Sequence, residues 1–348
     1  MTSGEDVQPQ AILTRYASAV KAEMGAVLAA PHPALAPFYG MMGYHLGWLD
    51  EDFETTGARM GKGIRPMLCL LACEALDGNW RRALPAAAAV ELVHNFSLIH
   101  DDIEDGSATR RGRPTVWSVW GEPHAINVGD GMLILARVAL HRLAERGVEA
   151  TKIQALARVL DEACLALCQG QYLDLSFEER LDVTVAEYMA MAEGKTAALL
   201  AAASQMGAML ASDDEELIAC YRRFGRHLGI AFQITDDILG LWGDEAVTGK
   251  SAVDDILQRK KTLPIVYTLQ QAADSKHVQE VFRKDVVDEG DIQAVLRILD
   301  EVDARGYAQR LAEEHRQRAL AELEATGIEH EAQERLRQLA LFLTERAY

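Results

Sequence analysis

The sequence predicts an all-α protein. Three observations favour this class: alanine, leucine and glutamate are abundant, valine, isoleucine and the aromatic residues are sparse in most segments, and no stretch alternates apolar and polar residues as a half-buried strand does. At 348 residues the chain exceeds the usual size of one domain, but helical proteins of this length can share one core. We therefore expect a single domain over residues 11–348, preceded by a flexible N-terminal tail at 1–10.

Helical patterns follow one another along the chain, separated by segments rich in glycine and proline. Breaks are predicted at Pro31 and Pro33, at 57–66, at 106–123, at Gly147 and at 240–264. The longest apolar stretch, 196–211, is interrupted by polar residues and is shorter than the roughly 20 residues that span a bilayer. We expect it to form a closely packed core helix, and we expect no membrane span.

Composition argues against several functional classes. The formal net charge of −18 argues against nucleic-acid binding, which needs a basic face. The five cysteines are odd in number and include no Cys-x-x-Cys, which fits a reducing cytoplasm, and the N-terminus lacks the basic and apolar segments of a signal peptide. Two cysteine pairs have the helical spacing of metal ligands, but buried thiols on a helix face are commoner. We expect a cytoplasmic protein.

Two aspartate-rich clusters, 101–105 and 236–240, lie within apolar segments that have helical periodicity. In the first segment one face is predicted to be apolar and another to carry polar groups; the apolar residues are Leu92, Phe96, Ile99 and Ile103, and the polar ones are His94, Asp101 and Asp105. In the second, an apolar face of Ile230, Ile234, Ile238 and Leu241 opposes Gln233, Asp236, Asp237 and Gly240. Carboxylates are therefore expected on one side of two buried helices.

Such carboxylates are costly to desolvate unless a cation compensates them, so two clusters facing each other would form a divalent-metal site. Oxygen-only ligands suit Mg²⁺, which binds through a few carboxylates together with substrate phosphates. Basic side chains that could hold phosphate are Lys62, Arg65, Arg110, Arg111, Arg113, Lys195, Lys250, Lys260 and Lys261. The sequence has no P-loop and no Gly-x-Ser-x-Gly or His-Glu-x-x-His motif. A phosphorylated substrate is therefore predicted.

Five ordered motifs resemble those of the trans-isoprenyl diphosphate synthases, the polyprenyl synthetase family. The run SLIHDDIED at 97–105, with TRRGRPT at 109–115, resembles the first aspartate-rich motif, and FQITDDIL at 232–239 resembles the second. The other matches are GKGIRP at 61–66, GKT at 194–196, and Gly249-Lys250 continued through Asp255, Lys260 and TLP at 262–264. The resemblance, most like a geranylgeranyl diphosphate synthase, implies an isoprenoid synthase fold, helices around a central catalytic cavity, and a homodimer.

Carried over position by position, the resemblance also implies roles for individual residues. Those expected to hold Mg²⁺, three ions in the family, are Asp101, Asp102, Asp105, Asp236 and Asp237. Those expected to hold the allylic diphosphate and its developing cation are Arg110, Lys195, Thr196, Gln233, Lys250 and Lys260, of which Lys195 joins the aspartates as catalytic. Those expected to bind isopentenyl diphosphate are Lys62, Arg65, His94 and Arg111. The implied reaction is ionisation of the allylic diphosphate, followed by attack of the isopentenyl double bond and loss of a proton.

Several of these residues have plainer interpretations. His94 fits a core histidine hydrogen-bonded between helices, and Lys195 and Thr196 fit a lysine and a cap residue at a helix end. Glu91 to His94 matches the Glu-x-x-His of a di-iron bundle, but a second such motif is missing from the sequence. A terpene cyclase of the same fold and a non-catalytic subunit of a heteromeric synthase are two further alternatives. The intact isopentenyl diphosphate residues weigh against the cyclase, and the retained aspartates weigh against the silent subunit.

The sequence departs from the family pattern at three places. Met60 and Gly63 stand where the early motif usually has glycine and a basic residue, so one diphosphate contact is in doubt. Gly240 stands where the second motif often has a third aspartate, so a third ligand there is also in doubt.

Product length is expected to depend on the first-motif helix. The growing chain should extend towards the N-terminal end of this helix, where Phe96, five residues before Asp101, would form a floor beside the small Ser97. In the family an aromatic residue at only the first of these positions resembles enzymes that make the C20 product. The alternatives are a farnesyl or longer-chain product, with Phe96 an ordinary member of the apolar stripe.

Overall fold

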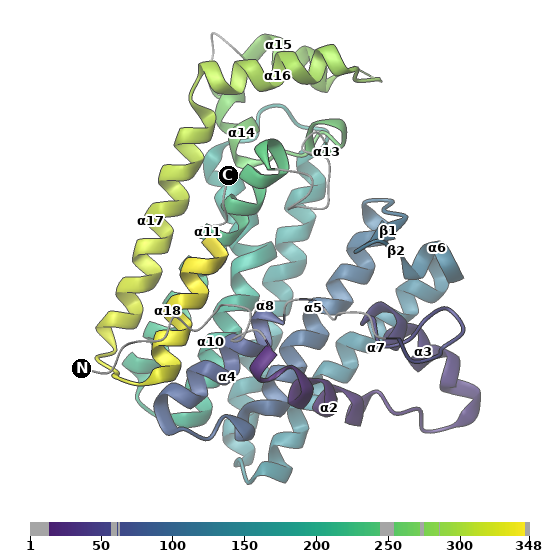
Figure 1. Cartoon of the computed structure of the whole chain (residues 1–348), viewed down its shortest axis with the longest axis vertical. Helices are drawn as coiled ribbons and strands as arrows, with labels where there is room; N and C mark the ends of the chain where they lie inside the picture. Colours follow the sequence, from purple (N-terminus) through teal and green to yellow (C-terminus); the bar gives the residue numbers. More distant parts are fainter. Residues whose placement is uncertain are drawn as a thin grey trace. The chain divides into compact units, whose positions relative to one another are not determined.

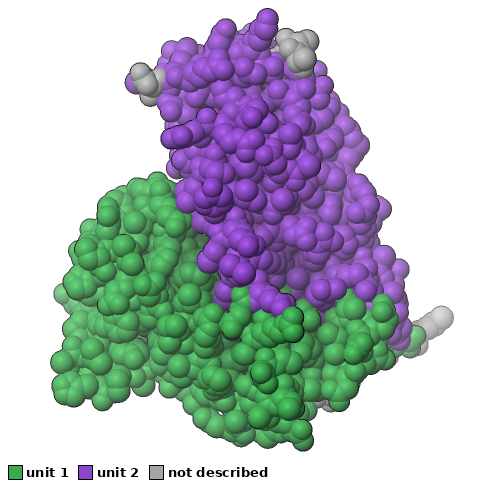
Figure 2. All heavy atoms as spheres, turned by 180° about the vertical axis from the view of Figure 1, so that it is seen from behind, with its two compact units in different colours: residues 1–161, 202–219, 328–336 green, residues 162–201, 220–327, 337–348 purple. Residues whose placement is uncertain are grey.

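The computed structural model describes residues 14–56, 61, 63–243, 254–271, 275–284 and 286–344. The chain forms two compact units, coloured separately in Figure 2: unit 1 comprises 1–161, 202–219 and 328–336, and unit 2 comprises 162–201, 220–327 and 337–348. The prediction of a single domain stays a prediction, and the tail expected at 1–10 falls outside the described residues. Among those residues, no helix is long and apolar enough to cross a membrane.

Helices dominate the described part of both units, which confirms the all-α prediction (Figure 1). The elements of unit 1 are α2 (Ala17–Val27), η1 (Pro33–Leu35), α3 (Ala36–His45), α4 (Ile64–Asp77), η2 (Trp80–Ala83), α5 (Leu84–Glu104), β1 (Thr109–Arg110), β2 (Arg113–Pro114), α6 (Val116–Trp120), α7 (Glu122–His141) and η3 (Arg142–Arg146). The strands β1 and β2 form an antiparallel hairpin in which Arg110 pairs with Arg113. This hairpin occupies the basic loop that follows the first aspartate cluster.

Four of the described helices have residues in both units, and the remaining elements belong to unit 2. The shared helices are α8 (Ala150–Phe177), α10 (Ala198–Ala211), α11 (Glu215–Trp242), most of which lies in unit 2, and α18 (Glu331–Thr344). The others are α9 (Val185–Ala192), η4 (Glu193–Ala197), α13 (Asp254–Leu257), α14 (Leu263–Leu269), α15 (Ser275–Phe282), α16 (Glu289–Glu301) and α17 (Ala304–Ala325). The segment η4 is a π-helix, and it joins α9 to α10 without a break.

Helix α5 is the central element of unit 1. It begins with Pro85 in its first turn, where the missing N–H costs nothing, and its four alanines Ala86 to Ala89 are fully buried. Small side chains allow close packing, and α5 contacts α7, α4 and α2. The predicted apolar stripe is confirmed at Leu92, Phe96 and Ile99, which are all buried. The opposite face consequently presents the polar residues of the first cluster.

Helix α11 has the same role in unit 2. Its apolar residues Ile230, Ile234 and Ile238 are at most 1% exposed and pack with side chains of α9, α14 and α17. The predicted stripe is therefore confirmed. The helix continues through Gly240 to Trp242, slightly beyond the break predicted at 240.

Close helix contacts in unit 1 require glycine at position 207. A Cβ atom added to Gly207 of α10 would overlap the Cys69 carbonyl oxygen of α4 and lie 2.9 Å from the carbonyl carbon. We predict that Gly207→Ala lowers the free energy of unfolding by about 1–3 kcal/mol, because two helix backbones must separate. Urea denaturation measures this change.

Gly25 provides the matched control, because it also lies within a helix but has no atom within 4 Å of its added Cβ. Gly25→Ala should raise the free energy of unfolding by up to about 1 kcal/mol through helix propensity. Equal effects of the two substitutions would contradict the packing argument.

A histidine pair links α11 to α17 inside unit 2. The Nδ1 atoms of His227 and His315 lie 3.1 Å apart, so at least one ring must be neutral for the hydrogen bond to form. Burial, the partner ring and Arg318 lower the pKa of His315 to about 4, against the opposing charge of Glu314. Burial and Arg226 likewise lower the pKa of His227, against Glu322 and Glu193.

This pair predicts a pH-dependent stability. A histidine pKa that is lower in the folded state leaves stability intact above the unfolded value of 6.5, and stability falls as pH drops from 6.5 towards 4. We expect a loss of about 2 kcal/mol from this pair between pH 6.5 and 5. His315→Gln should flatten that slope in urea titrations, whereas His277→Gln, at an exposed site, should not. Parallel slopes for all three proteins would refute the assignment.

Candidate active site

The first aspartate cluster ends helix α5. Asp102 is 1% exposed, and Asp101 and Asp105 are partly buried. Asp105 is the C-cap residue of the helix, and Ser107 then donates its backbone N–H to the Asp102 carbonyl at 2.8 Å. The chain therefore turns directly from the acidic cluster into the β1–β2 hairpin.

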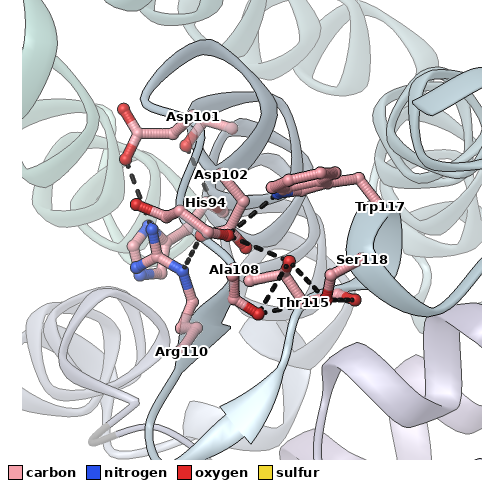
Figure 3. Close-up of polar contacts among 10 residues, drawn as sticks. His94, Asp101, Asp102, Ala108, Arg110, Thr115, Trp117 and Ser118 are labelled. Atoms are coloured by element: carbon pink, nitrogen blue, oxygen red, sulfur yellow. Dashed lines mark hydrogen bonds and ion pairs between the residues drawn. The ribbon is translucent and has the colours of Figure 1, made fainter. Parts of the chain in front are cut away.

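The hairpin directs Arg110 back towards the cluster. Figure 3 shows the guanidinium of Arg110 beside both aspartates; Nε donates to Asp102 Oδ1 at 2.7 Å, and Asp101 Oδ2 lies 3.4 Å from Nη2. The turn is fixed by neighbouring side chains: Trp117 Nε1 donates to the Ser107 carbonyl at 2.8 Å, and the Ser118 hydroxyl donates to the Ala108 carbonyl at 3.0 Å. The predicted proximity of Arg110 to the first cluster is thus present.

Asp102 is not fully compensated by these contacts. Burial raises the pKa of Asp102 to about 6, and the attraction of Arg110 only partly opposes this. Its Oδ2 atom is buried and has no hydrogen-bond partner. A buried carboxylate oxygen without a donor is unfavourable unless positive charge approaches it, so the cluster fits a hard cation that takes oxygen ligands.

A group of basic residues lies on the other side of α5 from its apolar stripe. His94 is surrounded by Arg65 of α4 and by Arg110 and Arg111 of the hairpin, and with burial these charges hold the pKa of His94 well below its ordinary value. The Arg111 guanidinium lies against Gly61, where an added Cβ would be 2.7 Å from Nη2. The early motif and the hairpin therefore meet around His94, while Lys62 and Met60 lie outside the part of the chain that the structure describes.

His45 of α3 belongs to the same basic group, although no motif or spacing in the sequence marks it. Burial, Arg110 and Arg111 lower its pKa to about 3, and its buried Nε2 has no hydrogen-bond partner. Asn95 donates to Glu91 Oε1 at 3.2 Å. Burial raises the pKa of Glu91, and Arg65 opposes that shift. Arg65 and Arg111 thus lie close to the buried His94 and His45, an arrangement that favours an anion.

The second cluster on α11 is organised differently. Asp237 Oδ2 accepts hydrogen bonds from the Tyr188 hydroxyl at 2.6 Å and from the Leu263 N–H at 2.9 Å, and Oδ1 accepts one from Gln233 Nε2 at 2.9 Å. Burial nonetheless raises the pKa of Asp237 to about 7, with a further contribution from the charge of Asp255. Asp237 thus joins α11 to α9 and α14, and Asp236 beside it is partly exposed.

The π-helix η4 places Lys195 and Thr196 next to this network. Lys195 Nζ lies 2.5 Å from Asp174 Oδ2 of α8, and the Thr196 hydroxyl donates to Gln233 Oε1 at 2.5 Å. Both residues are inside a continuous helical segment, so the alternative of a helix-end lysine and a cap residue is wrong. A π-turn inside a helix commonly marks a functional position.

Glycines allow η4 to approach α8 this closely. A Cβ on Gly170 would overlap the Lys195 backbone nitrogen, and one on Gly194 would lie 2.6 Å from the Ala166 carbonyl oxygen. Asp174 lies one turn after Gly170 on α8, and this close approach of α8 to η4 brings its carboxylate within 2.5 Å of Lys195 Nζ. The sequence analysis did not identify Asp174 or Tyr188, because nothing in their local pattern reveals a partner far along the chain.

The lysines after the second cluster have separate environments. Lys260 donates its backbone N–H to the Asp255 carbonyl at 2.9 Å, and Lys250 is outside the described ranges. Lys261 is 3% exposed, and its Nζ donates to the Glu178 and Arg259 carbonyls at 2.9 Å. Burial lowers the pKa of Lys261 to about 8. Lys261 is therefore part of the internal structure, whereas Lys260 stays a predicted phosphate ligand.

The predicted floor residues lie one turn before the first cluster. Phe96 is 5% exposed and meets the His100 ring edge-on at 5.7 Å between centroids. His100 in turn packs against Gly129 of α7, where a Cβ would lie 3.3 Å from Cε1. The Ser97 hydroxyl donates to the His94 carbonyl at 2.8 Å. Phe96 is thus buried beside His100, and it is His100 that lies at the contact of α5 with α7.

Taken separately, the two units hold complementary groups. Unit 1 contains the Asp102 carboxylate, which has one unpartnered oxygen, and the basic group around His94. Unit 2 contains Asp236, Asp237, Lys195 and Thr196. Among the described residues, no three acidic, histidine or cysteine side chains converge closely enough to hold an ion unaided.

Sequence comparison identifies a family and several relatives of this chain. The polyprenyl synthetase family model matches residues 47–299. A geranylgeranyl diphosphate synthase of Mycobacterium tuberculosis is 42% identical over 289 residues, covering 82% of this chain and 81% of that protein. A (2E,6E)-farnesyl diphosphate synthase of Mycobacterium bovis is 38% identical over 312 residues, covering 88% of this chain and 85% of that protein.

Solved structures agree with the sequence comparison. The polyprenyl synthetase of Streptomyces coelicolor A3(2) superposes with a TM-score of 0.87 at 35% identity, covering 96% of this chain and 98% of that one. A polyprenyl synthase of Caulobacter crescentus CB15, complexed with calcium and isoprenyl diphosphate, superposes with a TM-score of 0.78 at 25% identity over the whole of both chains. The chain therefore belongs to the polyprenyl synthetase family and is an isoprenyl diphosphate synthase, a prenyltransferase that makes short- or medium-chain trans-prenyl diphosphates.

Proposed function

We propose that this protein condenses isopentenyl diphosphate head to tail with an allylic diphosphate, in the presence of Mg²⁺, to give geranylgeranyl diphosphate. The observation that carries the proposal is the buried Asp102 carboxylate, which has one oxygen bound to Arg110 and the other without a partner. Such a group requires a cation, and a diphosphate bound to that cation would have Arg110 within reach.

The metal ligands follow from both aspartate clusters. Asp101, Asp102 and Asp105 of α5, with Asp236 and Asp237 of α11, would hold the Mg²⁺ ions, three by family resemblance. When bound, the ions would supply positive charge that stabilises the departing pyrophosphate. The calcium and isoprenyl diphosphate in the Caulobacter crescentus relative support a metal-assisted site of this kind.

The allylic diphosphate would be held by side chains that are paired with carboxylates in this structure. Arg110 contacts Asp101 and Asp102, and Lys195 contacts Asp174, so each can exchange part of that contact for phosphate oxygens. Lys250 and Lys260 would add further positive charge. The oxygens of Thr196 and Gln233 are held by a hydrogen bond to each other and would stabilise the allylic cation left by ionisation of the C–O bond.

Isopentenyl diphosphate would bind at the basic group around His94. Arg65, Arg111 and Lys62 would supply charge to its diphosphate, and His94 a hydrogen bond. A bound substrate is brought within reach of the cation without a diffusional encounter. Its double bond would then attack the cation, forming one carbon–carbon bond, and a proton would be lost from the adduct.

The C20 product is supported by the buried Phe96, five residues before Asp101 on α5, and by the similarity to a geranylgeranyl diphosphate synthase. The similarity to a farnesyl diphosphate synthase keeps a C15 product as the second candidate. We further propose a cytoplasmic homodimer. The exposed apolar side chains Ile126, Ile134 and Val138 along α7 support a second copy as partner.

The proposal predicts a defined product profile. Purified protein, labelled isopentenyl diphosphate and Mg²⁺ should give a C20 diphosphate from C5, C10 and C15 allylic primers, resolved by chain length. Asp102→Asn and Asp236→Asn should each lower kcat/KM by roughly 10²- to 10³-fold, because charge at the leaving group is lost.

Asp213→Asn is the control, because that carboxylate is 92% exposed and away from the clusters. It should leave kcat/KM unchanged. If no primer is condensed, the synthase assignment is wrong, and a cyclase or a non-catalytic subunit becomes the better assignment. A C15 end product would contradict the C20 assignment alone.

Phe96 gives a separate prediction for chain length. Phe96→Ala should shift the main product beyond C20, because the truncated side chain opens space along α5. Phe282→Ala, with nearly equal burial at 6% against 5%, removes the same volume from unit 2 and should leave product length at C20. A C20 product from both variants would show that the floor lies elsewhere.

A further inference from the structure

The two-residue loop of the β1–β2 hairpin holds an arginine in a backbone conformation that arginine disfavours. Arg111 has a φ of +54° and Gly112 a φ of +73°, and positive φ at both loop residues is typical of a type I′ turn. Asparagine and glycine are favoured there, because a larger side chain at positive φ crowds the backbone. Residues kept in such conformations cluster at functional sites, so the position of the Arg111 side chain needs an explanation.

The side chain of Arg111 reaches the basic group around His94. Its guanidinium lies against Gly61, and its charge is among those that lower the pKa of His94 and of His45. The left-handed turn therefore brings one positive charge to the place where isopentenyl diphosphate is proposed to bind.

The hairpin cannot keep this shape by itself. Each strand has two residues, and an isolated two-stranded hairpin is marginally stable at best. Arg110 and Arg113 are paired directly across the strands, where like charges repel. The turn therefore depends on contacts with the rest of unit 1. On the first strand, the contacts of Arg110 with Asp101 and Asp102 meet this need.

On the second strand, Arg113 anchors the hairpin to the end of α3 and the loop after it. Its Nη1 donates to the Tyr44 carbonyl at 3.1 Å, and its Nη2 donates to the Leu49 carbonyl at 2.8 Å. The guanidinium carbon lies 4.1 Å from the centre of the Tyr44 ring, and the Tyr44 hydroxyl donates to the Pro114 carbonyl at 2.8 Å. Tyr44 is 3% exposed and meets the Trp120 ring edge-on, so the anchor is itself fixed by packing.

These contacts indicate a role for Arg113 other than phosphate binding, for which its charge made it a candidate. Its guanidinium donates to two backbone carbonyls, and neither Tyr44 nor Leu49 is a predicted ligand of metal or substrate. Arg110, by contrast, contacts aspartates that are proposed to hold the ions, so its contacts would change when ions and substrate bind. The Arg113 anchor depends on none of these groups and is therefore retained throughout the reaction.

We infer that Arg113 is a positioning residue: by fixing β2 to Tyr44 and Leu49, it holds the left-handed turn that brings Arg111 to isopentenyl diphosphate. The inference rests on the proposed function and adds to it a residue that does not touch substrate. Because Arg113 acts through Arg111, loss of its donors weakens the binding of isopentenyl diphosphate. The allylic diphosphate is affected much less, because Arg110 keeps its own contacts with the first aspartate cluster.

The test is calorimetric binding of isopentenyl diphosphate to the full chain in the absence of an allylic primer, so that no condensation occurs. Arg113→Met keeps a flexible side chain against the Tyr44 ring but removes both donors. It should raise the Kd roughly tenfold, as expected when a phosphate loses one charge-assisted hydrogen bond from Arg111. In steady-state assays the KM for isopentenyl diphosphate should rise by a similar factor, whereas the allylic KM and kcat should stay within about twofold of the wild type.

A double-mutant cycle tests whether Arg113 acts through Arg111. Arg111→Gln should raise the Kd roughly tenfold or more, because a proposed phosphate contact is removed. Adding Arg113→Met to this variant should raise the Kd by less than about twofold further, since the residue that Arg113 positions is already absent.

Two further variants provide a milder change and a control. Tyr44→Phe removes only the hydrogen bond to the Pro114 carbonyl and should raise the Kd by about two- to threefold. Arg137→Met removes another hydrogen bond from an arginine to a backbone carbonyl in unit 1, that of Leu133 on α7, and should leave the Kd unchanged. Thermal unfolding checks that each variant is folded.

The outcomes separate this inference from the proposed function. A wild-type Kd in folded Arg113→Met, or in Tyr44→Phe if Arg113→Met does not fold, would overturn the inference alone. Full additivity of the Arg111 and Arg113 substitutions would do the same, and so would equal rises in the two KM values, which indicate a general disturbance of the site. Wild-type protein that neither binds nor condenses isopentenyl diphosphate would overturn the proposed function together with this inference.

Discussion

The cost of burying carboxylates is the constraint on which both halves of the candidate site depend. Asp102 and Asp237 are themselves buried, each three residues after an isoleucine of the apolar stripe, and burial raises the pKa of both, to about 6 and about 7. Asp237 accepts hydrogen bonds from three donors, whereas Asp102 keeps one oxygen without a donor. The first arrangement holds helices together, and the second leaves a buried oxygen that nearby positive charge would stabilise.

The basic side chains also fall into two groups, those that are paired with carboxylates and those that lie close to further positive charge. Arg110 and Lys195 are paired with carboxylates, so their charge is held in position and partly neutralised. His94 and His45 lie among arginines, and both imidazoles stay neutral because burial and the nearby positive charge lower their pKa values. A diphosphate entering the group around His94 would relieve that repulsion. The mutual repulsion of the arginines around His94 in unit 1 therefore favours the binding of an anion.

Helical periodicity predicted much of this organisation. The faces of α5 and α11 follow from apolar spacing alone, because burial of a stripe and the 3.6-residue repeat leave one orientation. Local pattern could not predict Asp174, Tyr188 or His45, whose partners lie 21 or more residues away in the sequence. The β1–β2 hairpin and the π-turn at Lys195 also went unpredicted, since the first is two residues per strand and the second depends on Gly170 of a different helix.

The π-turn has a consequence for how this segment can change in evolution. A π-turn accommodates one residue more than the regular helix around it, and each helical residue turns the chain by about 100°. Because the wide turn absorbs its extra residue locally, deleting that residue would restore a regular helix with α9 and α10 in nearly the same orientation, and Gly207 would keep its contact with Cys69. The local positions of Lys195 beside Asp174 and of Thr196 beside Gln233 would change instead. A change of length by one residue at η4 is therefore expected to alter these two polar contacts more than the packing of the helices.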